Sequence, residues 1–293
     1  MYEKIDSCPS CNYQEFTNHI ICDDHSLTHE SFAIMKCKNC ELLITSPRPS
    51  KGAIGKYYQF EDYISHTNKA TNPINWIYKL VRNHTIKTKF KLIQSLSDKE
   101  TILDYGCGTA QLLKYIKEQG WKVTGIEPDQ NARTIAQKNI GDTVFENIDK
   151  LPAKKYGIIS LWHVLEHVHD INETLQALKQ HLSKKSRLIV AVPNSASYDQ
   201  RFYKKHWAAY DVPRHLYHFN QETITALMKY NGYKLEATHP MKFDSFYVSL
   251  LSEKYKTGQS NYFKAFCIGL LSNRWAKKNN HNYSSIIYIF KKV

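Results

Sequence analysis

The stretch Thr101-Ile-Leu-Asp-Tyr-Gly-Cys-Gly-Thr109 decides the fold of this 293-residue chain. Its first five residues form a short apolar run that is typical of a buried strand. Apolar residues then recur at helical spacing, at Leu112, Leu113, Tyr115 and Ile116. The pattern predicts a strand, a glycine turn and a helix. Glycine lets the backbone approach a ligand closely, and a helix N-terminus favours a polar or anionic group, so we expect a ligand at this turn.

A second strand is predicted in the segment WKVTGIEPD, residues 121–129, which brings an acid to the end of the strand. This acid, Glu127, follows the first glycine by about 20 residues, the distance at which an acid accepts hydrogen bonds from both hydroxyls of a ribose. A dinucleotide-binding enzyme usually has a third glycine in a G-x-G-x-x-G pattern, and Gln111 stands at that position. The case for a pyrophosphate-containing cofactor is therefore weak.

The run Asp104-Tyr-Gly-Cys-Gly108 together with Glu127 resembles motif I and the following acidic position of class I S-adenosylmethionine-dependent methyltransferases. The resemblance covers about residues 72–293, and it includes the strand 156–163 with its following Val-Leu-Glu-His-Val run. It implies an α/β fold with a doubly wound, seven-stranded, mostly parallel, Rossmann-like sheet. It also implies S-adenosylmethionine as the cofactor. The further expected strands lie near 143–145, 187–192, 233–239 and 284–291, and the expected helices at 171–182 and 221–231.

The resemblance assigns cofactor-binding roles to matching positions. The two glycines pass under the methionine part of the cofactor, the aspartate lies near its amino group, and the glutamate holds the ribose. One pair of residues lies beside the adenine, and another closes over the cofactor from the fourth strand. In the same order, the implied cofactor-binding residues are Gly106 and Gly108 with Cys107 between them, Asp104, Glu127, Asn147 with Ile148, and Trp162 with His163.

Four of the seven cysteines form two pairs of Cys-x2-Cys spacing, separated by 25 residues: Cys8 with Cys11, and Cys37 with Cys40. Two such turns direct four thiolates at one point, which satisfies the closed tetrahedron of a structural zinc ion. We therefore predict a small N-terminal zinc ribbon that stabilises the fold and does not catalyse. Other possible ligands lie between the pairs, and we rank them lower: His19, Cys22, His25 and His29.

The composition and the charge distribution limit the class of protein. The chain has 40 Lys and Arg against 27 Asp and Glu, hence a net charge of +13, with 42% apolar residues. Residues 1–50 carry 4 basic against 7 acidic residues, whereas residues 201–293 carry 15 against 5. The basic C-terminal third either keeps the protein soluble or contacts phosphates or an anionic surface. No secretory signal precedes the cysteines, so we expect a cytoplasmic protein with reduced thiols.

Three segments are expected from these patterns: a zinc ribbon over residues 1–46, a helical linker or lid over 47–98, and a methyltransferase domain over 99–293. The linker should contain a helix between residues 72 and 96. An insertion at 241–281 predicts two amphipathic helices with basic flanks. These helices either cover the pocket or pack in a dimer, or they lie on a membrane surface and meet a lipid-linked substrate. We favour the lid or dimer.

A methyltransferase must align its acceptor and, for a hydroxyl or an acidic carbon, remove a proton. The densest group of suitable side chains lies in residues 206–219, after the fifth strand. The candidate bases are His215, His218, Tyr210 and, from the end of the fourth strand, His163. Arg214 either holds an anionic group of the substrate or pairs with Asp211 to brace the loop.

The run His163-Val-Leu-Glu-His167 also fits the H-x-x-E-H pattern of zinc proteases. We reject that function, because the run begins at the end of an apolar strand and no third ligand stands at a recognisable distance in the sequence. The resemblance to methyltransferases makes Glu166 and His167 mostly structural.

These patterns predict methyl transfer from S-adenosylmethionine to a small molecule, such as a sugar, a nucleotide sugar, or a polysaccharide or lipid-linked precursor. The acidic N-terminal segment makes RNA the second choice of acceptor, because like charges repel. A third hypothesis is a non-catalytic, zinc-containing scaffold that keeps the fold. The intact glycines and Glu127 argue against it. The atom methylated and the oligomeric state are left open.

Overall fold

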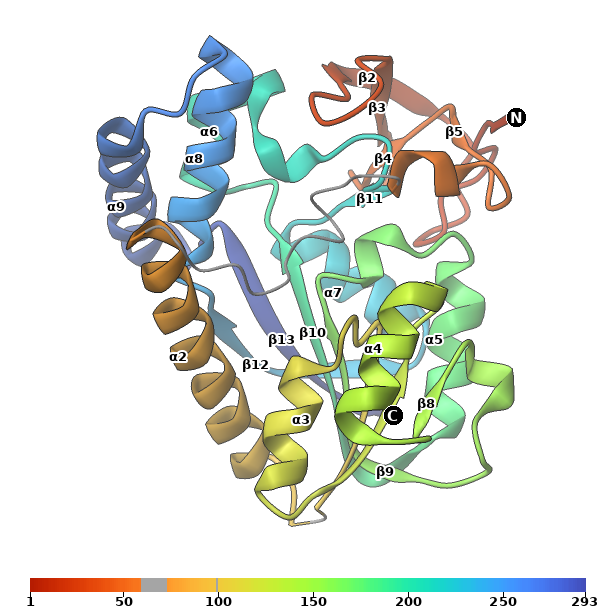
Figure 1. The fold of residues 1–293 in the computed structure, drawn as a ribbon. Helices are drawn as coiled ribbons and strands as arrows, with labels where there is room; N and C mark the ends of the chain where they lie inside the picture. The colour runs from red at the N-terminus through yellow and green to blue at the C-terminus, as the bar shows by residue number, and fades with distance from the viewer. Residues whose placement is uncertain (59–72, 99) are drawn as a thin grey trace. The chain divides into compact units, whose positions relative to one another are not determined.

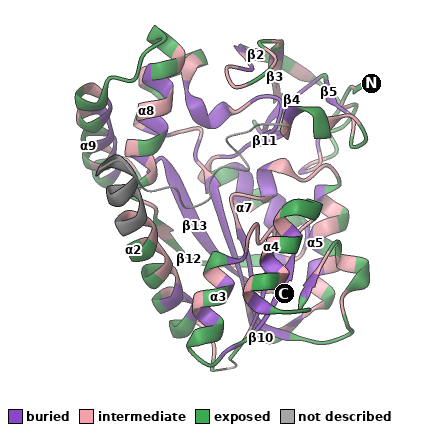
Figure 2. Cartoon of the chain, in the orientation of Figure 1, coloured by how far each residue is buried: buried purple, intermediate pink, exposed green. Residues whose placement is uncertain are grey.

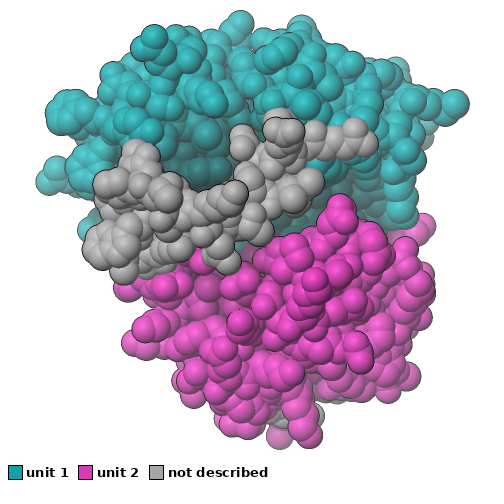
Figure 3. Space-filling model, in the orientation of Figure 1, with its two compact units in different colours: residues 1–59, 163–172, 190–289 teal, residues 60–162, 173–189, 290–293 magenta. Residues whose placement is uncertain are grey.

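A computed structural model describes residues 1–58, 73–98 and 100–293, with the backbone alone at 73–80. The chain forms two compact units, coloured separately in Figure 3. Unit 1 comprises residues 1–59, 163–172 and 190–289, and unit 2 comprises 60–162, 173–189 and 290–293. The boundary falls inside two strands, after Ile189 and after Ile289. This grouping differs from the three predicted segments, because the N-terminal residues cluster with much of the C-terminal half.

The predicted seven-stranded sheet is present, with strand order β12-β13-β10-β9-β6-β7-β8 (Figure 1). The pairs β6–β7, β6–β9 and β7–β8 are parallel. These strands have apolar, buried stretches, as strands covered on both faces require. Their bounds are β6 Thr101–Tyr105, β7 Lys122–Ile126, β8 Val144–Phe145, β9 Tyr156–Trp162, β10 Leu182–Pro193, β12 Tyr233–Pro240 and β13 Ser285–Lys292.

The helices of unit 2 follow from their apolar faces and caps. In α3 (Gln111–Glu118), Leu113 and Ile116 are fully buried, and Figure 2 shows α3 and α4 divided between buried and exposed residues. Helix α4 (Gln130–Ile140) is capped by Asp129, whose side chain accepts a hydrogen bond of 2.8 Å from the amide of Ala132. Helices α2 (Pro73–Ser95) and α5 (Ile171–Gln180) match the expected ranges.

The order of strands in unit 2 places a ligand site. The chain runs from β6 to β7 and β8 on one side, then returns to β9 on the other side of β6. In open parallel sheets, ligands bind beyond the carboxyl ends of the strands where the strand order reverses. Asp104 pairs with Gly125 of β7 and with Ser160 of β9, so the end of β6 lies at this reversal.

Unit 1 contains a separate four-stranded antiparallel sheet of order β11-β4-β3-β2. Its strands are β2 Phe16–Asp23, β3 Ser31–Cys37, β4 Leu43–Thr45 and β11 Tyr217–His218. Strand β11 comes from the loop in which the sequence predicted substrate-side residues. That loop is therefore built onto the N-terminal module. The short strands β1 (Tyr2–Glu3) and β5 (Arg48–Pro49) pair with each other.

The remaining helices of unit 1 are α6 (Tyr198–Tyr203), α7 (Gln221–Tyr230), α8 (Asp244–Thr257) and α9 (Tyr262–Lys278). The last two are the helices predicted in the insertion. They approach closely, because the buried face of α9 carries small residues and a Cβ at Gly269 would lie 2.6 Å from the ring of Phe246. None of the helices in the described parts of the chain combines the length and hydrophobicity that a membrane-spanning helix needs.

One buried carboxylate joins four segments of unit 1. Asp199 of α6 is fully buried and accepts three hydrogen bonds of 2.7 Å, from Trp207 Nε1, Ser272 Oγ and Ser284 Oγ. These donors lie in the loop after α6, in α9 and just before β13. Because all three donors are satisfied by one group, its removal leaves several buried polar atoms without partners.

We expect Asp199→Ala to lower the free energy of unfolding by about 3 kcal/mol or more, since each orphaned buried donor costs about 1–3 kcal/mol. Urea denaturation of both proteins measures the difference. Asp6→Ala, which removes an exposed aspartate of the same unit, is the control and should change stability by less than about 0.5 kcal/mol. Equal stability of Asp199→Ala and the wild type would contradict this role.

Candidate cofactor and acceptor site

The glycine turn after β6 is held by the end of β7. Gly106 and Gly108 have φ angles of 74° and 54°, in the left-handed region that favours glycine. The amides of Gly106 and Cys107 both donate to the carbonyl oxygen of Ile126, at 2.8 and 2.9 Å. The turn therefore keeps one shape, with its backbone open to a ligand beyond the strand ends. Apart from Gly108 and its two chain neighbours, none of the described residues has an atom within 4 Å of the position that a Cβ on Gly108 would take.

Glu127 follows β7 directly and is fixed by two backbone amides. Its Oε2 accepts a hydrogen bond of 2.8 Å from Gly108 N, and its Oε1 accepts one of 3.0 Å from Asp129 N. Burial raises the pKa of this carboxyl. Each carboxylate oxygen can accept more than one hydrogen bond, so Glu127 keeps the capacity to accept two ribose hydroxyls.

Asp104 at the end of β6 is 4% exposed and accepts a hydrogen bond of 2.6 Å from Ser160 Oγ of β9. Burial raises its pKa to about 6, although the bond from Ser160 and the charge of Lys89 lower it. Such a carboxyl is stabilised in its charged form by an approaching ammonium group. This environment fits the amino group of the methionine part of the cofactor.

Two residues that support this turn were not predicted from the sequence. A Cβ on Gly125 of β7 would lie 2.6 Å from Cys107 Sγ and 3.2 Å from Leu113 Cδ1, so only glycine fits opposite the turn without displacing a neighbour. Ser160 orients Asp104. The Thr-Gly-Ile pattern of β7 was the available signal for Gly125, because glycine inside a strand often marks a close approach.

The end of β9 contributes an aromatic side chain. The Nε1 of Trp162 is buried and has no hydrogen-bond acceptor among the described residues. The ammonium of Lys89 lies 4.1 Å from the centroid of its ring. At the edge of the same sheet, Asn147 and Ile148 follow β8, with Asn147 exposed. The glycine turn, the anchored acid, and this unpaired donor fit an adenosyl cofactor with a positively charged amino acid end.

The four predicted zinc ligands meet in unit 1. The Sγ atoms of Cys8 and Cys40 are 3.4 Å apart, those of Cys11 and Cys37 are 3.6 Å apart, and all four lie within 4.8 Å of one another. A tetrahedral zinc site with Zn–S bonds of about 2.3 Å has sulfur atoms separated by about 3.8 Å. The thiols are free of disulfide bonds. The cluster is therefore compatible with the zinc ribbon.

Three of the four predicted base candidates are buried in unit 1. Tyr210, His215 and His218 are 1%, 8% and 4% exposed. Gln200 Nε2 donates a bond of 2.8 Å to the hydroxyl of Tyr210, and His218 Nε2 lies 3.0 Å from Thr45 Oγ1. Burial lowers the pKa of His218 well below its usual value and raises that of Tyr210. The identity of the base stays a prediction.

The fourth candidate, His163, is the residue after β9 and has one-third of its side chain exposed. Its φ of 55° is unusual for a residue other than glycine, a feature that clusters at functional sites. Its Nε2 lies 3.1 Å from Asp244 Oδ2. Burial lowers the pKa of His163, but the carboxylates of Asp244 and Glu166 outweigh this effect and raise the pKa to about 9.

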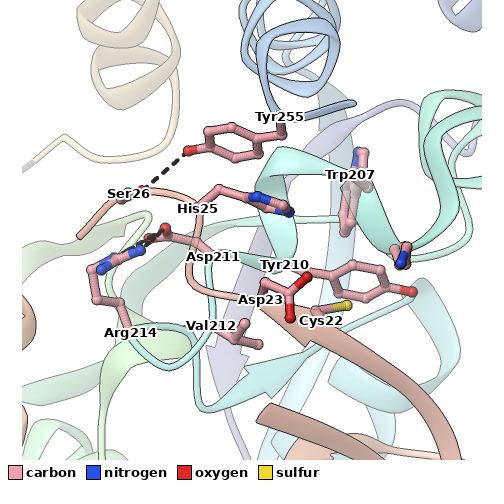
Figure 4. Close-up of a pocket in the computed structure, with 11 residues that line it drawn as sticks. Cys22, Asp23, His25, Ser26, Trp207, Tyr210, Asp211, Val212, Arg214 and Tyr255 are labelled. Carbon is pink, nitrogen blue, oxygen red and sulfur yellow. Dashed lines mark hydrogen bonds and ion pairs between the residues drawn. The ribbon is translucent and has the colours of Figure 1, made fainter. Parts of the chain in front are cut away.

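Arg214 braces the loop by pairing with Asp211, which is one of the two roles predicted for it. It is 6% exposed, and its guanidinium pairs with Asp211 at 2.7 Å and with Asp24 at 2.9 Å. Figure 4 shows Arg214 directed at Asp211 in a pocket that also includes Tyr255. That pocket encloses about 10 Å³, which is about the room that one water molecule needs. It is too small for an organic substrate.

A reversal of parallel strands, with a glycine turn after β6 and an anchored acid after β7, defines the class I fold of S-adenosylmethionine-dependent methyltransferases. The model of the methyltransferase domain family matches residues 81–238, more than half of the chain. The chain belongs to this family and is an S-adenosylmethionine-dependent methyltransferase.

Several known proteins are similar to this chain. An uncharacterized methyltransferase of Geobacillus sp. (strain WCH70) is 28% identical over 160 residues, covering 48% of this chain and 73% of the relative. Ubiquinone biosynthesis O-methyltransferases of Rickettsia typhi and Pseudoalteromonas translucida are 28% and 34% identical. Their alignments cover 39% and 29% of this chain, but only 49% and 39% of those relatives.

Among solved structures, the magnesium protoporphyrin IX methyltransferase of Synechocystis PCC 6803 with bound SAH has a TM-score of 0.53 and 15% identity. The superposition covers 83% of this chain and all of that one. At this identity the likeness shows the shared fold.

The raised pKa of Asp104 predicts a pH-dependent stability. Between about pH 4, its usual unfolded pKa, and pH 6, the folded protein binds more protons at this carboxyl than the unfolded chain does, so stability falls as the pH rises. Asp104→Asn removes this effect. Without cofactor, we expect its stability relative to the wild type to increase by about 2 kcal/mol between pH 4 and pH 7, which is most of the roughly 2.7 kcal/mol that two pKa units imply.

Urea denaturation of both proteins at several pH values between 4 and 7 measures this difference, and titrating groups that do not interact with Asp104 cancel in the comparison. A constant difference over the whole range would contradict the raised pKa of Asp104.

Proposed function

We propose that this methyltransferase transfers the methyl group to a small-molecule acceptor, such as a sugar, a nucleotide sugar or a lipid-linked precursor. The observation that carries the proposal is the charge of the N-terminal module. Five of the six basic residues in 1–58 form ion pairs, and the module has seven acidic residues. A module that grips RNA instead presents unpaired cations to the phosphates.

The names of two relatives support the same class of acceptor. Both are O-methyltransferases of ubiquinone biosynthesis, hence enzymes named for a small-molecule product. Their partial coverage leaves the acceptor of this chain to experiment. An oxygen atom is the acceptor that this similarity favours.

The surface of α9 supports a lipid-linked form of the acceptor as a second candidate. Phe263 is 80% exposed, and Phe266 and Tyr262 are more than half exposed. Basic side chains lie on α9 and on the preceding helix α8, at Lys254, Lys256, Arg274, Lys277 and Lys278. Exposed aromatic side chains beside basic ones are typical of helices that lie on an anionic membrane surface.

The acceptor is tested by incubating the full chain with methyl-labelled S-adenosylmethionine and three fractions of a bacterial extract: small polar molecules, lipids and RNA. We expect ribonuclease-resistant label in the small-molecule fraction or the lipid fraction. Label in RNA would overturn the proposal. A folded protein that binds the cofactor but labels no fraction would favour the non-catalytic scaffold. Glu127→Ala serves as the background control.

We also propose that the four N-terminal cysteines hold a structural zinc ion. The separations of their sulfur atoms support this, and a closed set of four thiolates leaves no position for a substrate. Cys37 ends β3, and Cys40 precedes β4, so the ion would hold the turn between two strands of the small sheet.

Replacement of zinc by Co²⁺ tests this site, because thiolate ligands give cobalt an intense charge-transfer absorption. We expect the absorption in the wild type and in Cys267→Ser, whose cysteine lies outside the cluster. Cys37→Ser should lose much of the absorption and unfold at a lower temperature, since structural zinc contributes about 10–16 kcal/mol of binding free energy in small fingers. The same spectrum in both variants would contradict the proposal.

A further inference from the structure

Unit 1 contains a second group of metal-ligating side chains, far from the cysteines in sequence. A carboxylate oxygen of Glu166 and one ring nitrogen each of His167 and His215 lie within 4.8 Å of one another. The first two residues are in the 3-10 turn Leu165–His167 after β9. His215 lies 48 residues beyond His167, in the loop before β11. This is the third ligand that sequence spacing did not reveal.

The hydrogen bonds of the two histidines fix which ring nitrogen is available. His167 Nδ1 lies 3.0 Å from the carbonyl oxygen of Arg214, and His215 Nδ1 lies 2.8 Å from that of Ala209. A carbonyl oxygen only accepts, so each Nδ1 carries the proton. In this tautomer, the lone pair of each imidazole lies at Nε2. Metal-binding histidines are oriented in this way by a bond from the other ring nitrogen to a backbone carbonyl.

Among the described residues, no group donates a hydrogen bond to either Nε2 atom. The ring centroids of His167 and His215 are 4.6 Å apart, and the rings are nearly perpendicular, at 78°. Asp211 Oδ2 lies 3.9 Å from His215 Nε2, beyond hydrogen-bond distance, and an ionised carboxylate has no proton to donate. The Nε2 lone pair of each ring is therefore available to a metal ion.

Glu166 supplies the negative charge. It is fully buried, and neither of its oxygens has a hydrogen-bond donor among the described residues. His163 Nδ1 lies 3.4 Å from Oε1 and supplies one opposite charge. This ion pair offsets part of the cost of burying the carboxylate, and a metal ion held with His167 and His215 would offset more of it.

We propose that Glu166, His167 and His215 bind one divalent transition-metal ion through one oxygen and two nitrogen atoms. Imidazole and carboxylate ligands suit zinc, iron and related ions, whereas four thiolates form the closed structural site. Three protein ligands leave at least one coordination position for water or another oxygen ligand. This site is independent of the acceptor proposed above.

The test is the number of zinc ions bound per chain after metal removal, reconstitution of the full protein and desalting, measured by elemental analysis. We expect two ions in the wild type and one in His215→Ala, with the remaining ion held by the cysteines. His218→Ala is the matched control, since it removes a neighbouring buried histidine outside the cluster. It should retain two ions. The same number of ions in the wild type and in His215→Ala would overturn the proposal.

A spectroscopic measurement on the wild type keeps the proposal testable if the variants fold poorly. Zinc-loaded protein, with its cysteine site filled, is titrated with Co²⁺. We expect one further cobalt ion per chain with weak ligand-field bands and without thiolate charge-transfer absorption, as nitrogen and oxygen ligands give. Absence of saturable cobalt binding, or bands showing thiolate ligands only, would contradict the site.

Discussion

The carbonyl oxygen of Ile126 is the point on which the cofactor turn depends. It accepts hydrogen bonds from the amides of Gly106 and Cys107, and so ties the turn after β6 to the last residue of β7. Glu127, the residue after β7, accepts a hydrogen bond from the amide of Gly108. These contacts hold the glycine turn and the ribose acid in one arrangement. A Cβ at Gly125 would disturb it, because Cys107 Sγ already fills that space.

A different constraint organises unit 1. The hydroxyl of Thr45 in β4 bonds to the carbonyl of His215 and lies 3.0 Å from His218 Nε2. Arg214 adds ion pairs to Asp24 and Asp211. The loop before β11 is thus fixed by the N-terminal sheet rather than by its own sequence neighbours. The zinc site that we propose would stabilise this sheet, and the sheet in turn positions His215.

The sequence allowed prediction of the parts that rest on local patterns. The glycine turn, the ends of the parallel strands and the helices of 241–281 follow from apolar periodicity and from residues next to one another in the chain. The pairing of β11 with β4 joins residues more than 170 positions apart, and no local pattern encodes it. For the same reason, His215 was missed as a neighbour of Glu166 and His167. Gly125 was overlooked because its requirement arises from Cys107 on another strand.

Calorimetric titration of S-adenosylmethionine into the purified full chain tests the central claim most directly. The account predicts saturable binding at one site, weakened about 10- to 100-fold in Glu127→Ala by the lost hydrogen bonds to the ribose. Glu118→Ala, an exposed glutamate on α3, should bind as the wild type does. Absence of binding by the folded wild type, or equal affinity in Glu127→Ala, would contradict the account.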